Sequence, residues 1–257
     1  MTNIHPTAII DKTAKIGENV FVGPFCIIGK NVTIGDNCHL QSNVLIFKNT
    51  TIGKNNKFFH SAVIGTDPQD LKYIGEETCL TIGDNNIFRE FVTVNRSATM
   101  DENTNVGSNS LFMAYVHIAH NCQIGNNIII ANAVNLAGHI HIDDFVTIGG
   151  MTAIHQFVKI GSYAFVGGAS GAKKDVPPFT RGEGMPYKVI GLNSVGLRRK
   201  GFTSQDLKDI KSIYKIFYQS GLNVSDALAK AETLSDISKF QQVFINFVKK
   251  SDRGLSK

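Results

Sequence analysis

The chain has 257 residues with a net charge of +5, and its composition of 42% hydrophobic and 18% charged residues excludes an intrinsically disordered protein. No apolar run has the length of a membrane span, and the N-terminal residues do not resemble a signal peptide, so we expect a cytoplasmic protein without an integral membrane segment. The four cysteines lack Cys-x-x-Cys spacing, which argues against a disulfide framework and a zinc knuckle.

A large apolar residue recurs every six residues from Ile4 to Val166. Of the 28 positions in this register 26 are apolar, and glycine follows twelve of them. A period of six fits neither an α-helix nor a hairpin sheet, but it is typical of a solenoid of short parallel strands. Three hexads would make one triangular coil, so each residue should stack on the residue 18 positions later.

Two interruptions of the repeat predict excursions from the coil stack. Asp70 and Glu76 break the register, which predicts an outward loop near residues 66–80. Residues 95–105 form a second, smaller candidate. Three cysteines, Cys26, Cys38 and Cys122, fall at inward positions, where small core side chains are expected.

The repeat ends near Ala172, and an extended segment and then helices are expected after it. Thr203 with Asp206 predicts a helix N-terminus, Gly221 its end, Ser225 the start of a second helix, and Phe240 lies in the apolar stripe of a third. We therefore expect a parallel β-helix domain over 1–190 and a C-terminal α-helical domain over 191–257.

The C-terminal segment is strongly basic. Residues 188–257 contain 13 Lys and Arg but only 6 Asp and Glu, whereas residues 1–187 contain 13 and 15. This imbalance indicates either a solvated helical face or a docking surface for an acidic partner.

Four of the eight histidines should gather on one edge of the solenoid. Stacking by 18 residues places Gly138 on His120, with His117, His139 and His155 beside them. His120, His139 and His155 fall at corners and His117 at an outward strand position, so none should point into the core. A convex corner makes no pocket, so a second copy of the chain is the natural source of a second wall.

Clustered imidazoles suit general-base catalysis or metal binding, and a hydrogen-bonded surface ladder is the alternative without function. No carboxylate falls in the stacked column itself. This absence favours a catalytic base over a metal site.

Several segments together resemble the UDP-N-acetylglucosamine 3-O-acyltransferase family of lipid A biosynthesis, in order and over essentially the whole chain. They are Gln69-Asp70-Leu71-Lys72-Tyr73, His117-Ile118-Ala119-His120-Asn121-Cys122, Leu136-Ala137-Gly138-His139, Gly149-Gly150-Met151-Thr152-Ala153-Ile154-His155-Gln156-Phe157, Asp175-Val176-Pro177-Pro178, Gly191-Leu192-Asn193 and Gly196-Leu197-Arg198-Arg199-Lys200-Gly201-Phe202. The hexapeptide repeat alone is shared by many transferases, whereas this combination of motifs is specific.

The resemblance implies a left-handed parallel β-helix and a homotrimer with active sites between subunits. It implies that His120 is the general base for transfer of a 3-hydroxyacyl chain from acyl carrier protein to the 3-hydroxyl of UDP-N-acetylglucosamine. The Gly138 N–H would stabilise the oxyanion. No cofactor, metal or nucleic acid is implied, and the acidic carrier protein would suit the basic tail.

The resemblance also assigns substrate-binding roles. The family's sugar-nucleotide and acyl-chain contacts match Asp70, Lys72, His117, His139 and Gln156. Asn193 and Arg199 match nucleotide or phosphopantetheine contacts, and His155 a residue that supports the site. Gly168 falls where the family sets acyl-chain length, and a glycine there implies a long chain.

Two departures from the family pattern bear on the site. The residue after the base is often aspartate and here is Asn121, which accepts a hydrogen bond but stabilises an imidazolium less than a carboxylate does. Val195 stands where a glutamate is common, which leaves transfer to a UDP 3-amino sugar as an alternative.

Other readings of the sequence are the sister N-acyltransferase, an acetyl-CoA-dependent acetyltransferase, a metal-dependent hydratase of the same solenoid fold and a scaffold protein. The sister enzyme usually carries an extra N-terminal domain, for which a repeat that begins at Ile4 leaves no room. The 66–80 loop and the long tail argue against the acetyltransferase, and bound zinc would favour the hydratase.

Overall fold

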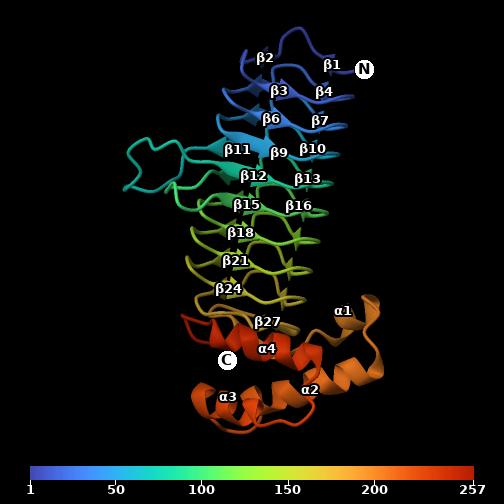
Figure 1. The fold of residues 1–257 in the computed structure, drawn as a ribbon, viewed down its shortest axis with the longest axis vertical. Helices are drawn as coiled ribbons and strands as arrows, with labels where there is room; N and C mark the ends of the chain where they lie inside the picture. The colour runs from blue at the N-terminus through green and yellow to red at the C-terminus, as the bar shows by residue number, and fades with distance from the viewer.

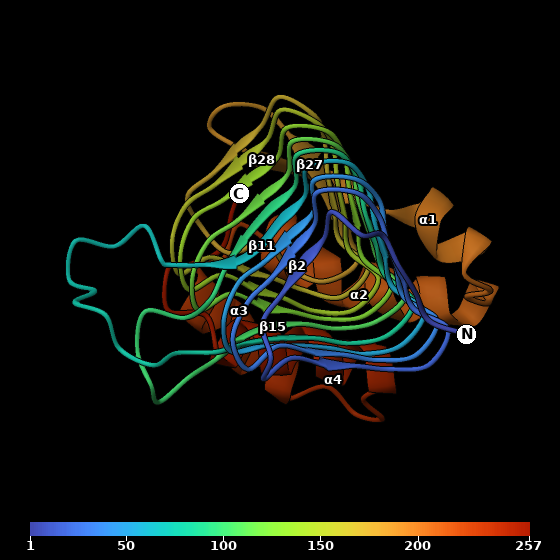
Figure 2. The ribbon, with the colours of Figure 1, turned by 90° about the horizontal axis from the view of Figure 1, so that it is seen from above.

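A computed structural model describes residues 1–257 as a tall stack of triangular coils with helices at its C-terminal end (Figure 1). Seen from the N-terminal end, the chain runs counter-clockwise as it recedes, so the parallel β-helix is left-handed, as the resemblance implied (Figure 2). The strands form three sheets, here called A, B and C, one on each side of the triangle.

Almost all neighbouring strands within a sheet are parallel. Sheet A contains β1 (Asn3–Ile4), β4 (Phe21–Val22), β7 (His39–Leu40), β10 (Lys57–Phe58), β13 (Ile87–Phe88), β16 (Leu111–Phe112), β19 (Ile129–Ile130), β22 (Thr147–Ile148), β25 (Phe165–Val166), β27 (Thr180–Glu183) and β28 (Lys188–Leu192). Sheet B contains β2 (Ile9–Ile10), β5 (Ile27–Ile28), β8 (Leu45–Ile46), β11 (Val63–Thr66), β14 (Thr93–Asn95), β17 (His117–Ile118), β20 (Asn135–Leu136), β23 (Ala153–Ile154) and β26 (Gly171–Ala172). Sheet C contains β3 (Lys15–Ile16), β6 (Thr33–Ile34), β9 (Thr50–Ile52), β12 (Leu80–Ile82), β15 (Thr104–Val106), β18 (Gln123–Ile124), β21 (His141–Ile142) and β24 (Lys159–Ile160).

The repeat explains this architecture residue by residue. The residue at each hexad's aliphatic position and the residue two before it point inward, so Cys26 and Ile28, for example, are fully buried. They belong to one continuous core of 41 buried residues that runs along the stack. Within it Phe58, Phe88 and Phe112 stack at centroid distances of 4.9 and 4.8 Å.

Most corners turn on one residue in the left-handed backbone region. Asn tolerates positive φ better than most residues, and the corners between sheets C and A use it repeatedly, from Asn19 (φ 54°) to Asn127 (φ 59°). Short strands joined by such corners keep the 18-residue register, in which His117 pairs with Asn135 and Asn135 with Ala153.

The two predicted excursions are present. Residues 67–79 leave the stack between β11 and β12 and form the long loop that projects from it in Figures 1 and 2. Residues 96–103 form a shorter excursion between β14 and β15. Both start from the corner between sheets B and C, so they lie on the same edge of the solenoid.

The end of the stack differs in part from the expectation. The segment after Ala172 does not stay a simple extended exit, because β27 adds to sheet A in parallel with β25 and then pairs with β28 as an antiparallel hairpin. The glycines at 182 and 184 lie in or next to this hairpin.

Four helices follow: α1 (Ser194–Arg199), α2 (Ser204–Tyr218), α3 (Val224–Glu232) and α4 (Lys239–Lys249). The Thr203–Asp206 capping box opens α2 as predicted, whereas α3 begins at Val224, one residue earlier than expected. The short α1 was not predicted. Gly221 has φ +77° but lies beyond the C-cap Gln219, so α2 ends slightly before the predicted position.

A second core of 12 buried residues holds the helices together and reaches the last coil through Phe179. Phe202 packs edge-on against Tyr163 at a centroid distance of 4.9 Å and in a tilted arrangement against Phe240 at 4.7 Å. The helices are therefore seated on the end of the solenoid by aromatic contacts. None of the four has the length and apolar run that a bilayer crossing requires.

Candidate active site

The structure gathers eight of the eleven predicted site residues at one edge of the solenoid. We call the turns 119–122, 137–140 and 155–158, between sheets B and C, the histidine corner. It contains His120, Gly138, His139, His155 and Gln156; His117 lies beside it on β17, and Asp70 and Lys72 lie in the 67–79 loop.

His120 is the most enclosed of these side chains. Only 8% of the residue is exposed, although it lies outside the coil core, because the two excursions cover this corner. Its Nε2 lies 3.9 Å from Asp70 Oδ2. The carboxylate that the stacked column lacks is thus supplied by the loop, which also forms one wall of the site.

Asn121 determines which ring nitrogen of His120 carries the proton. Asn121 Oδ1 accepts a hydrogen bond from the Ala98 N–H at 2.9 Å, while its Nδ2 donates to Thr99 Oγ1 at 3.2 Å. The amide orientation is therefore set by its partners, and Oδ1, an acceptor, lies 3.0 Å from His120 Nδ1. In the neutral ring Nδ1 must then carry the hydrogen, which leaves the Nε2 lone pair free to accept a proton.

Gly138 lies directly against the imidazole, as the stacking arithmetic predicted. A Cβ at this position would be 2.6 Å from His120 Cε1 and 2.7 Å from Nε2, so no side chain fits without displacing the ring. The Gly138 N–H forms no hydrogen bond within the chain, although its neighbour His139 N donates to His120 O at 3.0 Å. Gly138 therefore places an unpaired amide donor beside His120.

The side chains of His117 and His139, which neighbour His120, favour the neutral form. Burial lowers the pKa of His117, and proximity to His120 lowers it further; the same two causes lower the pKa of His139. His117 Nδ1 lies 2.7 Å from Thr93 Oγ1, and the His139 ring stacks on Phe157 at 4.7 Å and meets His120 edge-on at 5.2 Å. Near neutral pH both rings thus act as hydrogen-bonding groups without charge.

Lys72, His155 and Gln156 are exposed around His120. The Lys72 N–H donates to Asp70 Oδ1 at 2.9 Å, so Asp70 caps its own loop turn. His155 Nδ1 lies 3.1 Å from the backbone oxygen of Gln156. These polar side chains are free to contact a bound molecule.

Three predicted site residues lie at other corners. Gly168 is in the turn between sheets A and B, across the width of sheet B from the histidine corner. Asn193 caps α1 and donates to Tyr163 O at 3.0 Å at the corner between sheets C and A, and the exposed Arg199 ends the same helix. A single copy therefore does not bring these residues to His120; in Figure 2 the 67–79 loop and α1 lie on opposite sides of the stack.

Sequence reasoning missed the residues that hold the two excursions in place. Thr104 Oγ1 accepts from the Asn121 N–H at 2.8 Å, and the fully buried Arg96 contacts Asp67 and Tyr73 of the 67–79 loop. The sequence offered one signal for Arg96, namely that a charged residue stands where the repeat is interrupted. No group of three or more His, Cys, Asp or Glu side chains has a geometry that would hold a metal ion.

Comparison with known proteins places this site in a defined context. Residues 175–256 match the family model described as UDP-N-acetylglucosamine O-acyltransferase, domain 2, and residues 13–48 and 103–138 match the bacterial transferase hexapeptide repeat. Acyl-[acyl-carrier-protein]–UDP-N-acetylglucosamine O-acyltransferases from Paracidovorax citrulli and Halorhodospira halophila are 52% and 48% identical to the chain. The alignments cover 100% of both chains in the first case and 99% of both in the second.

The solved structures agree with the sequence relatives. The structure of UDP-N-acetylglucosamine acyltransferase from Francisella novicida superposes with a TM-score of 0.96 at 40% identity, over 98% of this chain and 93% of that one. The similarity thus extends over the coil stack, both excursions and the helices.

Proposed function

Because the chain belongs to the acyl-[acyl-carrier-protein]–UDP-N-acetylglucosamine O-acyltransferase family, we propose that it transfers a 3-hydroxyacyl chain from acyl carrier protein to the 3-hydroxyl of UDP-N-acetylglucosamine. This is the first step of lipid A biosynthesis. The observation that best supports the proposal is the arrangement at His120, where Nδ1 faces Asn121 Oδ1 and the free Nε2 faces the loop beside the unpaired Gly138 N–H.

The proposed reaction uses His120 as a general base. Nε2 accepts the proton of the sugar 3-hydroxyl as the oxygen attacks the thioester carbonyl carbon, and the negative charge that develops on the carbonyl oxygen is stabilised by the Gly138 N–H. Collapse of this intermediate breaks the C–S bond. The His120 imidazolium then returns its proton to the thiolate of the carrier's phosphopantetheine arm, which restores the base.

Substrate binding is assigned to the side chains around this pair. Asp70, Lys72, His117, His139 and Gln156 would contact the sugar nucleotide and the start of the acyl chain, and His155 would support them. The lowered pKa values of His117 and His139 suit this role, because a neutral imidazole beside His120 does not oppose formation of the imidazolium during the reaction.

We propose that the active protein is a homotrimer with each site between two copies. Gly168, Asn193 and Arg199 lie away from His120 in one copy, so a neighbour has to supply them if they serve the same site. An exposed apolar edge between sheets A and B supports association. It is here called the aromatic corner and consists of Phe25, Phe91, Tyr115 and Met151.

The acyl carrier protein would bind the C-terminal helices. Carrier proteins of this kind are acidic, and the helical segment carries most of the excess positive charge of the chain. Arg198 and Arg199, in the last turn of α1, and Lys200 after it form one exposed basic group. Binding there should weaken as ionic strength rises.

A product assay tests the proposed reaction. Purified protein is incubated with 3-hydroxymyristoyl-acyl carrier protein and UDP-N-acetylglucosamine, and the acylated UDP-sugar is measured by mass spectrometry. We expect His120→Ala to lower the rate by about 10² to 10⁴-fold. His141→Ala, an exposed histidine on β21, is the matched control and should retain activity. Undiminished product from His120→Ala would remove His120 from its role, and no product from the wild type would contradict the proposed reaction.

A further inference from the structure

The 67–79 loop carries Asp70 to His120, yet little apolar packing holds it there. Its two large aliphatic side chains, Leu71 and Ile74, are 105% and 89% exposed. A loop without a buried apolar anchor would sample many positions unless polar contacts fix it. The contacts between this loop and the coil stack therefore decide where Asp70 lies.

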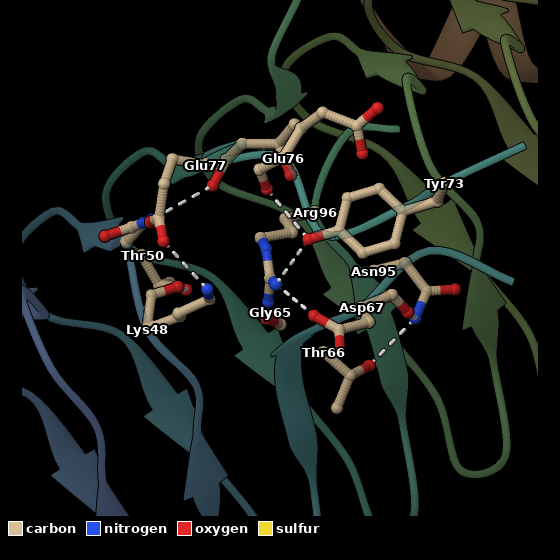
Figure 3. A network of polar contacts seen from close by, with 12 residues as sticks. Lys48, Thr50, Gly65, Thr66, Asp67, Tyr73, Glu76, Glu77, Asn95 and Arg96 are labelled. Carbon is tan, nitrogen blue, oxygen red and sulfur yellow. Dashed lines mark hydrogen bonds and ion pairs between the residues drawn. The ribbon is translucent and has the colours of Figure 1, made fainter. Parts of the chain in front are cut away.

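Arg96 provides several of these contacts from one side chain (Figure 3). Nη1 donates to Gly65 O at 2.9 Å, just before the loop leaves the stack. Nη2 forms an ion pair with Asp67 and donates to Tyr73 Oη at 2.9 Å. One guanidinium thus contacts the start of the loop, its outgoing limb and its middle.

The position of Arg96 makes this arrangement rigid. The residue is fully buried, and its Asp67 partner, with a side chain 67% exposed, lies on the surface above it. Asn95 also holds the start of the loop, because its Nδ2 donates to Thr66 Oγ1 at 2.8 Å and to Asp67 O at 2.9 Å. The planar fork of arginine can make these divergent hydrogen bonds at once, whereas the single ammonium of lysine cannot.

The contacts of Arg96 bracket Asp70 in the chain. Asp67 lies three residues before Asp70 and Tyr73 three residues after it, and the Tyr73 N–H donates to Asp70 O at 3.1 Å. Asp70 in turn faces His120 Nε2 at 3.9 Å. Arg96 touches neither His120 nor Asp70, so any effect on the reaction has to pass through the loop.

We propose that Arg96 is a positioning residue that fixes the 67–79 loop over His120 and so sets the place of Asp70 and Lys72 in the sugar-nucleotide site. The inference rests on the proposed function only for the identity of the substrate. We call the contacts of Arg96 with Gly65, Asp67 and Tyr73 the arginine clasp.

Kinetic measurements on conservative variants test the arginine clasp. Arg96→Lys keeps a buried positive charge near Asp67 but loses the fork, and Tyr73→Phe removes one of its acceptors. We expect Arg96→Lys to raise KM for UDP-N-acetylglucosamine by about tenfold with a smaller change in kcat, and Tyr73→Phe to have a smaller effect in the same direction. Glu77→Gln is the matched control, because Glu77 ties the returning limb to Lys48 at 3.1 Å on the exposed side and should leave KM near the wild-type value.

A double-mutant cycle separates positioning from general destabilisation. If Arg96 acts through the loop, Arg96→Lys should add little to the KM of a variant that already carries both Asp70→Ala and Lys72→Ala, because the two groups that it positions are then missing. A change in KM of the same factor in both backgrounds would overturn the proposal. So would a KM for Arg96→Lys equal to that of the wild type.

Limited trypsin digestion tests the arginine clasp without the reaction. Lys72 is exposed in the loop, so the rate of cleavage at the Lys72–Tyr73 bond, followed by mass spectrometry on the intact assembly, reports loop mobility. We expect this rate to rise severalfold in Arg96→Lys, relative to cleavage in the C-terminal segment, and not in Glu77→Gln. An unchanged ratio overturns the positioning role even if the wild type is inactive with the proposed substrates, whereas a raised ratio in an inactive protein supports the clasp and places the failure with the substrates.

Discussion

The aromatic corner and the histidine corner share one backbone and differ in chemistry. Met151 in the first and His139 in the second occupy the same position of the hexad, and both have φ 58°. Along the aromatic corner the side chains are bare, with Tyr115 59% exposed, whereas His120 in the histidine corner is 8% exposed because two excursions cover it. The same corner backbone thus accepts different side chains, so one corner can be apolar and exposed while another is polar and covered.

The repeat determines the backbone path of every coil, but it does not determine which side chains stand at the corners or where the chain leaves the stack. The inward positions and the left-handed corner are needed at every coil, so they recur along the stack regardless of function. Excursions leave only from the corner between sheets B and C, and they turn a convex edge into an enclosed site. Under the proposed function, one corner performs the chemistry and the other brings copies together.

The largest effect should come from adding one methyl group beside the base. Gly138→Ala places a Cβ 2.6 Å from the His120 ring and should displace it, which lowers kcat by about 100-fold. Gly150→Ala is the matched change at the aromatic corner, where the nearest atom is Asn132 O at 3.0 Å and the next lies at 3.8 Å. It should retain most of the activity. Equal losses in the two variants would contradict the distinction between the corners.

Removal of the group that orients His120 should have the next largest effect. Asn121→Ala leaves Nδ1 without its acceptor and also removes the contacts of Asn121 with Ala98 and Thr99 in the 96–103 excursion, so we expect kcat to fall roughly 10- to 100-fold. Asn121→Asp instead introduces a carboxylate that stabilises the imidazolium, so the acid limb of the pH profile of kcat/KM should move to higher pH. An unmoved acid limb would show that residue 121 does not face the ionising group.

A polar residue at the aromatic corner should weaken assembly and spare the fold. Tyr115 has φ 64° and stacks on Phe91 at 5.1 Å, and asparagine tolerates this backbone well. Tyr115→Asn is therefore expected to keep the circular dichroism spectrum and to dissociate at protein concentrations where the wild type remains associated. Sedimentation velocity over a dilution series measures this. Identical dissociation of variant and wild type would show that this edge is not part of the interface.

The smallest effect concerns stability in mild acid. Burial lowers the pKa of His139 in the folded protein below the unfolded value of about 6.5. Between these two values the unfolded chain binds more protons, so stability falls as pH drops through this window and changes no further below the folded pKa. His139→Asn, which keeps a residue suited to φ 58°, should reduce the loss of melting temperature between pH 7.5 and 5.5. The reduction is partial because the pKa of His117 is lowered for the same reasons. If the variant loses as much melting temperature as the wild type, His139 does not contribute to the acid sensitivity.

The sequence predicted the coil stack well because its signal is repeated many times. Each hexad gives the same inward residue and the same turn, so the register could be extended to place Gly138 on His120 without a structure. The hairpin of β27 and β28 and the short α1 escaped prediction because each occurs once, without a periodic signal. The division into domains at residue 190 stays a prediction, since the two cores meet at Phe179.

The sequence predicted which residues gather at the histidine corner, but it did not predict that the 67–79 loop covers them. Stacking arithmetic places residues within the coils, whereas the path of the 67–79 loop depends on contacts such as Arg96 with Asp67, which pair residues far apart in the chain. The approach of Asp70 to His120 is of this kind. The roles of the eleven site residues remain proposals, and the variants above test those of His120, Gly138 and Asp70.

The claim that each site joins the histidine corner of one copy to Arg199 of the next is tested most directly with mixed trimers. His120→Ala and Arg199→Ala chains, each strongly impaired alone, are co-expressed with different tags, and trimers that carry both tags are isolated for the acyl-transfer assay. Every trimer that carries both tags has intact partners on both sides at one of its three interfaces, so activity should return to about a third of the wild type. Activity that stays at the average of the two parents would contradict a site shared between copies.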